Sequence, residues 1–507
     1  MKLDFDAALE KVGGFGFVQQ IHFTLLFLMQ FFQTPFIVLL AFVGKEPAFI
    51  CKGRPGSDPC KLQPPCKEYL YSKNFTSIVS EWDLVCERKA NAGYAQSLLM
   101  FGYLIGVVAV GRASDKFGRR RTFVGGILAL VVVQFISAFT QNIYQYALTR
   151  FLGGFLYGGA GLAGYVLMLE GLLPKKSALL NSIFNCSCSV AIVSLAVMAY
   201  YIRDWRHLTL LNCFLMASIV IVPLLVPESA RWLASQGRIT EAEDQLVNFG
   251  RRNGVWPCPT TITLTDKREE TKGKSSVGVL DLFRTPMLRR RMIILMITWF
   301  SCCLAYYGLT FGASSLGGNM YVNFALSGIV EIPATLLSTY ALNRIGRRPT
   351  MASSLFIAGL ACLGVMTLQK SEGSEMSSMQ TYLALTGKMG ISVAFNSVYL
   401  YSSELLPTVL RNTGLGVCSM SARLGGVIAP TLPPYGEKVA YLAFGLTALL
   451  SAVLDMTLPE SLNKQLPETI MDIEKGPSMP VLHPEKPMLS ADNDDKVQSD
   501  RGLGVNS

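Results

Sequence analysis

Charged residues are scarce in this chain. Of 507 residues, 16% are Asp, Glu, Lys or Arg and 50% are hydrophobic, whereas soluble domains carry ~25% charged residues. This composition excludes a soluble protein of ordinary type and indicates a polytopic membrane protein. Histidine is rarer still, because only the scattered His22, His207 and His483 occur. Without a His cluster, a P-loop or a Ser-x-x-Lys arrangement at a membrane face, we predict no enzyme, no cofactor and no metal site.

The positive charge is a topology signal. The net charge is +10, but Lys and Arg fall in short loops and form no stripe, so nucleic acid is not a predicted partner. They gather on one side of the apolar runs, in residues 112–121, 175–176, 289–291, 344–348 and 411, whereas the opposite loops 141–142 and 314–319 carry none. The basic side is therefore predicted to be cytoplasmic. The acidic start, residues 1–6, lacks the order of a cleavable signal, and both termini are expected in the cytoplasm.

Apolar runs long enough to cross ~30 Å of hydrocarbon recur along the chain. They predict twelve transmembrane helices, at 18–43, 92–112, 123–141, 145–168, 177–201, 208–226, 291–313, 320–341, 350–368, 380–402, 412–433 and 437–457. The predicted fold class is an all-α membrane protein.

Polar segments divide these runs into two sets of six. We expect a cytoplasmic N-terminus (1–17), a first half (18–226) with a large extracellular loop (44–91), a partly helical cytoplasmic linker (227–290), a second half (291–457) and a disordered tail (458–507).

A basic hairpin occurs twice. Residues 111–121 read GRASDKFGRRR, and residues 343–348 read NRIGRR. Pro-Glu-Ser likewise follows each half, at 227–229 and 459–461. The first hairpin fits the loop pattern G-x-x-x-D-[RK]-x-G-R-[RK] of the major facilitator superfamily, which it resembles. The duplication predicts two related six-helix halves with a site between them at the membrane midplane.

The first long loop has the features of an oxidised, extracellular segment. It holds Cys51, Cys60, Cys66 and Cys86, together with the glycosylation sequon that begins at Asn74. Zinc is the alternative, but no histidine lies nearby and the spacing fits no common zinc motif. We favour disulfides and leave their connectivity open.

Several motifs together resemble solute carrier family 22, the organic cation, anion and zwitterion transporters. They include residues 80–86 (SEWDLVC), 115–121, 149–151, 227–233, 401–408 (YSSELLPT) and 411–414. Residues 306–310, 325–333 and 414–420 look most like the member 15 branch. The resemblance implies a plasma-membrane carrier for small zwitterions and cations, such as ergothioneine, carnitine or carnosine, that acts as a monomer in the lipid bilayer.

Ionisable side chains in the middle of a span are costly, so each is a candidate for the site. Arg423 is predicted to bind a substrate carboxylate, since guanidinium binds carboxylate bidentately. Glu331 is predicted either to hold a substrate cation or to pair with Arg423. In related anion carriers a Lys stands four residues after this Glu, where this chain has Thr335. Aromatic and polar neighbours complete the predicted site: Trp299, Tyr306, Tyr307, Asn396 and Tyr399.

Charged residues near the ends of the spans are predicted to lie at the membrane interface or to form gating ion pairs. Arg150 and Lys388 are expected to extend toward the interface. Glu170 and Glu404 are expected to pair with arginines of the hairpins in the outward-open state. The predicted gating set is Asp115, Arg119, Arg120, Glu170, Arg347, Arg348 and Glu404.

The sequence is compatible with several other functions. A carrier for cations alone or for organic anions is the main alternative. A sugar porter is a further one, because residues 227–233 (PESARWL) resemble a motif of that family. A nontransporting receptor has no need of gating charges in both halves. The coupling ion is not defined by the sequence.

Overall fold

The computed structural model describes residues 2–474 except 4, 53–58, 62–65, 67, 219, 221–225, 256–262, 265–277, 369–373 and 465. The tail beyond 474, most of the linker between 256 and 277 and the end of the sixth predicted span lie outside the described residues.

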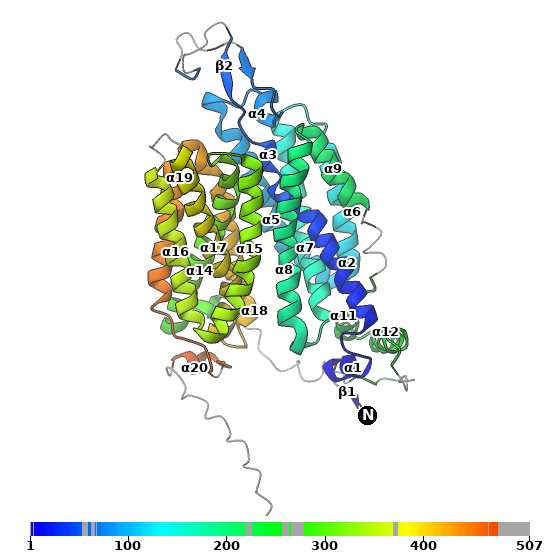
Figure 1. Cartoon of the computed structure of the whole chain (residues 1–507). Coiled ribbons are helices and arrows are strands. Elements are labelled where there is room, and N and C mark those ends of the chain that lie inside the picture. The colour runs from blue at the N-terminus through cyan, green and yellow to red at the C-terminus, as the bar shows by residue number, and fades with distance from the viewer. Residues whose placement is uncertain are drawn as a thin grey trace, which may run out of the picture.

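The membrane helices form two bundles that stand side by side (Figure 1). The first half contains α2 (Phe17–Val38), α3 (Leu40–Val43), α5 (Ala90–Phe117), α6 (Arg119–Ser137), α7 (Ile143–Glu170), α8 (Pro174–Tyr201) and α9 (Trp205–Ser218). The second contains α14 (Pro286–Gly312), α15 (Met320–Arg344), α16 (Arg347–Leu368), α17 (Ser374–Leu405), α18 (Arg411–Ile428) and α19 (Glu437–Asp455). The 3-10 turns η3 (Ala313–Ser315), η4 (Ala429–Thr431) and η5 (Pro433–Tyr435) extend α14 and α18.

Within the described residues, ten helical segments are long and apolar enough to cross a membrane. The two other predicted spans correspond to α9, whose described part has 14 residues, and to the 32-residue α17. The predicted all-α membrane protein of two six-helix halves is confirmed. Most predicted spans are shorter than the helices, because hydropathy marks the hydrocarbon-facing part while the helical hydrogen bonds continue into charged residues.

One residue makes each basic turn. The helices α5 and α6 meet at Gly118 (φ +106°), and the repeat between α15 and α16 turns at Gly346 (φ +115°). These φ values favour glycine, which has no Cβ to clash with the neighbouring carbonyl groups. We call the end of the bundle that carries Gly118 and Gly346 the hairpin face.

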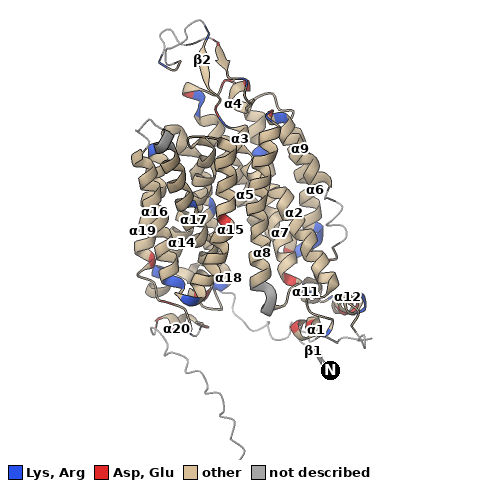
Figure 2. Ribbon diagram, viewed as in Figure 1, with Lys and Arg blue, Asp and Glu red and all other residues tan. Residues whose placement is uncertain are grey.

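Short elements cover the two ends of the bundle. At the hairpin face lie α1 (Phe5–Lys11), α11 (Ala230–Ser235), α12 (Ile239–Arg252), η2 (Val279–Phe283) and α20 (Ile470–Glu474), and β1 (Lys2–Leu3) pairs with β4 (Thr263–Leu264). At the opposite end lie β2 (Phe49–Cys51), β3 (Tyr69–Tyr71), α4 (Ile78–Glu81) and η1 (Cys86–Arg88). Two disulfides, Cys51–Cys66 and Cys60–Cys86, tie this second end together, and we call it the disulfide face. Charged residues concentrate near the two ends (Figure 2).

Side-chain contacts join the two halves in the region between the midplane and the disulfide face. The hydroxyl groups of Tyr94 and Tyr435 are 3.0 Å apart. The ring of Phe42 stacks on that of Tyr321, with centroids 5.6 Å apart, and Tyr321 also contacts Tyr200. In Figure 1 the ribbons of α8 and α18 are separated at the hairpin face. The two halves are therefore packed together on the disulfide side.

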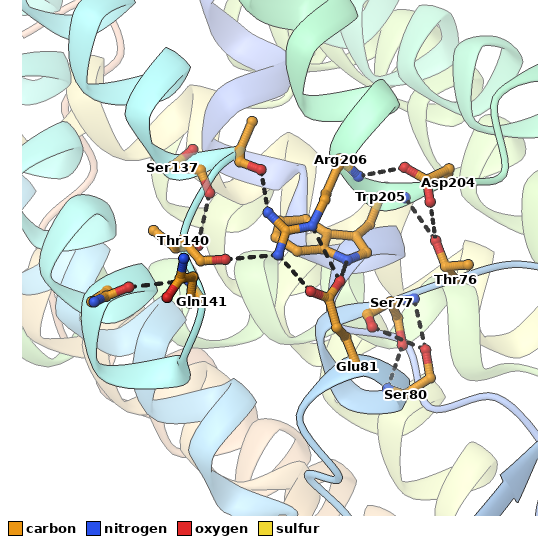
Figure 3. Close-up of polar contacts among 12 residues, drawn as sticks. Thr76, Ser77, Ser80, Glu81, Ser137, Thr140, Gln141, Asp204, Trp205 and Arg206 are labelled. Carbon is orange, nitrogen blue, oxygen red and sulfur yellow. Dashed lines mark hydrogen bonds and ion pairs between the residues drawn. The ribbon is translucent and has the colours of Figure 1, made fainter.

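A polar cluster at the disulfide face joins α4 to α9 (Figure 3). Glu81 accepts hydrogen bonds from the indole nitrogen of Trp205, at 2.6 Å, and from the guanidinium group of Arg206. Arg206 also donates to the carbonyl oxygens of Ala138 and Thr140. One guanidinium group therefore connects the long loop, α9 and the turn after α6.

Arg206→Lys is expected to destabilise this end of the protein. An ammonium group has no planar fork, so it cannot replace the contacts to both Glu81 and the two carbonyl groups. Hydrogen bonds to charged groups contribute ~1.5 to 3 kcal/mol each, and we expect a lower melting temperature in detergent. Arg203→Lys is the matched control, because the contacts that the Arg203 side chain makes with the described residues are local, to the carbonyl oxygen and the ring of Tyr200. Equal melting temperatures for the two variants would contradict the proposed role.

Candidate functional site

The first charge centre is an ion pair between α15 and α17. The ammonium nitrogen of Lys388 lies 2.7 Å from a carboxylate oxygen of Glu331, and both side chains are buried. The same nitrogen donates to the hydroxyl of Thr310 at 2.6 Å and lies 3.4 Å from the ring centroid of Tyr306. Ser189 of α8 donates to the second carboxylate oxygen of Glu331 at 3.0 Å. The first half thus contacts this centre directly.

The second charge centre is Arg423 on α18. Its guanidinium carbon lies 4.1 Å from the ring centroid of Tyr103, which belongs to α5 in the other half. Its buried Nε has no hydrogen-bond partner among the described residues. Across the part of the chain that the structure describes, no ion pair links Arg423 to a carboxylate. This centre therefore presents a positive charge without a fixed counter-charge.

The predicted alternative of a Glu331–Arg423 pair is wrong for this structure. Glu331 pairs with Lys388 instead. The expectation that Lys388 and Arg150 extend to the interface is also wrong, since their exposures are only 1% and 2%. Arg150 donates to the side-chain oxygen of Gln96 at 3.0 Å and lies over the ring of Phe36. Local polar and aromatic partners keep both cations inside the bundle.

A row of aromatic rings runs between the neighbourhoods of the two centres. Tyr307 contacts Tyr306, with centroids 5.4 Å apart, and Tyr306 stacks on Phe395 at 5.4 Å. The row continues to Tyr399 at 5.9 Å and to Trp299 at 4.4 Å. The predicted aromatic residues are thus brought together. Phe395, which was not among the residues predicted from the sequence, completes the row.

The predicted residues differ in accessibility. Tyr399 is 45% exposed, whereas Trp299 is buried and donates to the hydroxyl of Ser402 at 2.8 Å. Asn396 is half-buried and donates to the hydroxyl of Thr335 at 3.2 Å. Tyr399 and Asn396 are therefore the more accessible candidates, while Trp299 supports the ring of Tyr399.

Charges at the hairpin face of the first half form a local network. Arg119 pairs with Asp115 at 2.5 Å and with Glu170 at 3.4 Å. Glu228 accepts a hydrogen bond from the backbone N–H of Arg120 at 2.9 Å. The network therefore holds the first basic turn against the end of α7 and the segment after α9.

The second half repeats this arrangement. Arg347 makes two hydrogen bonds to Glu404, at 3.0 and 3.1 Å. Glu460 accepts from the backbone N–H groups of Arg347 and Arg348. Burial alone raises the pKa of Glu460, but backbone donors, including Leu462, outweigh it, so its pKa is lowered. The repeated Pro-Glu-Ser segments thus supply the carboxylate that binds each basic turn, a role that the sequence repeat alone did not reveal.

A cavity of about 230 Å³ lies between the halves on the disulfide side. Its lining includes Lys45, Glu46 and Lys89 of the first half and Glu437 of the second. Burial lowers the pKa of Lys45, and the carboxylates of Glu437 and Glu46 oppose that shift. Lys89 pairs with Glu46 at 2.8 Å. The cavity therefore holds charges of both signs.

The duplicated six-helix halves and the charged centre at their interface define a transporter of the major facilitator fold. The inward-open xylose transporter XylE from E. coli superposes with a TM-score of 0.63 at 15% identity, over 90% of this chain and 99% of that one. The partially occluded inward-open form gives the same TM-score over 89% and 99%. At this identity the likeness shows the fold alone.

Sequence comparison gives the family. A family model described as "Sugar (and other) transporter" matches residues 64–468. Solute carrier family 22 member 15 of Xenopus tropicalis is 37% identical, over 94% of this chain and 92% of its own length. The organic cation transporter protein of Drosophila melanogaster is 34% identical over 81% and 76%, and member 7 from Homo sapiens 36% over 85% and 80%. The chain belongs to solute carrier family 22 and is a multi-pass membrane transporter of small organic solutes.

Proposed function

We propose that this protein transports small organic zwitterions and cations of the ergothioneine, carnitine or carnosine type. The observation that carries the proposal is the pairing of two charge centres along one aromatic row. Among the described residues the guanidinium group of Arg423 has no carboxylate partner, and it suits a substrate carboxylate. Glu331 and the ring of Tyr306 together bind an ammonium group in the structure, that of Lys388, and the same chemistry suits a substrate ammonium.

An organic anion is the second candidate substrate, because the buried charges of the site do not cancel. Glu331 is already neutralised by Lys388, so Arg423 leaves a surplus positive charge at the centre. A monoanion neutralises that charge without any rearrangement. A zwitterion does so only with its carboxylate end, and its ammonium group then depends on the aromatic rings or on Glu331.

Transport is proposed to proceed by alternating access, with the hairpin face in the cytoplasm and the disulfide face outside the cell. The contacts of Tyr94 with Tyr435 and of Phe42 with Tyr321 close the disulfide side, and this arrangement corresponds to an inward-facing state. The pairs of Arg119 with Glu170 and Arg347 with Glu404 were expected in the outward-open state, but both are formed in this inward-facing arrangement. They are therefore proposed as gate elements that act within their own half. Each lies within one half, so it stiffens the end of that half. We further propose that the protein is a monomer in the plasma membrane and that it is glycosylated at Asn74.

Uptake of labelled ergothioneine, carnitine, tetraethylammonium and succinate by expressing cells tests this function. We expect saturable uptake of the two zwitterions, slower uptake of tetraethylammonium and little uptake of succinate. Cells that carry the empty vector are the control. Succinate uptake that exceeds zwitterion uptake would replace the proposal with the organic anion carrier.

A further inference from the structure

We propose that Lys388 occupies the cation-binding part of the substrate site as a tethered ammonium group and thereby selects zwitterions over simple cations. This inference rests on the proposed function and names a residue that sets its specificity. Lys388 was expected at the membrane interface, but it lies between Glu331, Thr310 and Tyr306.

The surroundings of this ammonium group are those of a recognition site for an organic cation. A carboxylate oxygen lies at 2.7 Å and the centroid of an aromatic ring at 3.4 Å. Such a combination of carboxylate and ring face binds ammonium ligands in general. Ser189 contacts the same carboxylate from the other half of the protein. A substrate cation that reaches Glu331 must therefore displace Lys388 at the interface between the halves.

Displacement has different consequences for the two substrate classes. A simple cation that takes Glu331 leaves the ammonium group of Lys388 buried, with the hydroxyl of Thr310 as its one remaining polar partner among the described residues. A buried charge without a counter-charge is strongly unfavourable. A zwitterion brings a carboxylate together with its cation. That carboxylate can pair with the displaced Lys388, so the ammonium group keeps a counter-charge. A carboxylate that pairs with Arg423 alone would leave Lys388 unpaired, as a simple cation does.

Carnitine and choline form a matched pair of probes. Both carry a trimethylammonium group, and only carnitine adds a carboxylate. Their binding to the purified full-length protein in nanodiscs is measured for the wild type, Lys388→Gln, Thr310→Val and the double variant Lys388→Gln/Glu331→Gln. Lys438→Gln, at an exposed lysine of α19, is the matched control for the loss of one positive charge.

We expect Lys388→Gln to tighten choline binding about tenfold and to reduce the preference for carnitine by at least that factor. Thr310→Val removes the hydroxyl partner that a displaced Lys388 would keep, at 2.6 Å, without touching Glu331, so it is expected to weaken choline binding and to raise the preference for carnitine. The double variant is expected to lose the gain in choline affinity, because the carboxylate is gone. Lys438→Gln should leave both affinities unchanged.

Choline binding that is unchanged or weaker in folded Lys388→Gln, or unchanged or tighter in folded Thr310→Val, would overturn the inference and reduce Lys388 to a structural partner of Glu331. If Lys388→Gln does not fold, the weaker choline binding expected of Thr310→Val decides alone. Absence of carnitine binding to the wild type would instead overturn the proposed function. If the wild type binds carnitine but the variants keep the same preference for carnitine over choline, the proposed function stands and the proposed role of Lys388 in selectivity is rejected.

Discussion

Arg423→Ala is expected to reduce zwitterion uptake about 10- to 100-fold, in line with the ~1.5 to 3 kcal/mol of a charge-assisted hydrogen bond. The substitution removes the guanidinium group that lies over Tyr103 and has no carboxylate partner within the described chain. No buried acid is therefore stranded, and the variant is expected to reach the cell surface in normal amount. Initial uptake rates of carnitine and tetraethylammonium, divided by surface expression, give the measurement.

Two further variants at this position separate charge from geometry. Arg423→Lys keeps the positive charge but loses the bidentate fork, so it should retain part of the zwitterion uptake. Arg423→Asp reverses the charge and should shift the preference from zwitterions to cations. A correctly trafficked Arg423→Asp variant with wild-type selectivity would show that Arg423 does not contact the substrate.

Hydropathy and duplication were sufficient to predict the membrane architecture. Twelve apolar runs, two basic hairpins and two Pro-Glu-Ser segments are local patterns of the sequence. The hairpins and the Pro-Glu-Ser segments meet in local structures around Gly118 and Gly346. Hydropathy locates a side chain along the membrane normal. It does not give the direction in which that side chain points around the helix axis.

The partners of the buried charges depend on that direction, and the sequence did not provide it. Glu331 and Lys388 lie on different helices, and nothing in either span distinguishes a pair between them from one with Arg423. Arg423, Tyr306 and Tyr399 were predicted from the sequence as site residues, and the structure joins Tyr306 and Tyr399 through the ring of Phe395. The prediction missed the contributions of Tyr103 and Ser189 from the first half, because an aromatic ring or hydroxyl in an apolar span carries no distinctive signal.

Gly106→Ala is expected to destabilise the protein strongly, because α5 and α7 are in close backbone contact at this glycine. A Cβ at Gly106 would lie 2.0 Å from the carbonyl oxygen of Phe155, so Gly106→Ala must push the two backbones apart. The cost should reach or exceed the upper end of the ~1 to 3 kcal/mol of overpacked cores, because small residues allow this close approach in membranes. We expect a much lower melting temperature in detergent and loss of surface expression and uptake. Gly125→Ala, where a Cβ meets nothing within 4 Å on the neighbouring α6, should behave as the wild type. Equal stability of the two variants would mean that α5 and α7 do not depend on this contact.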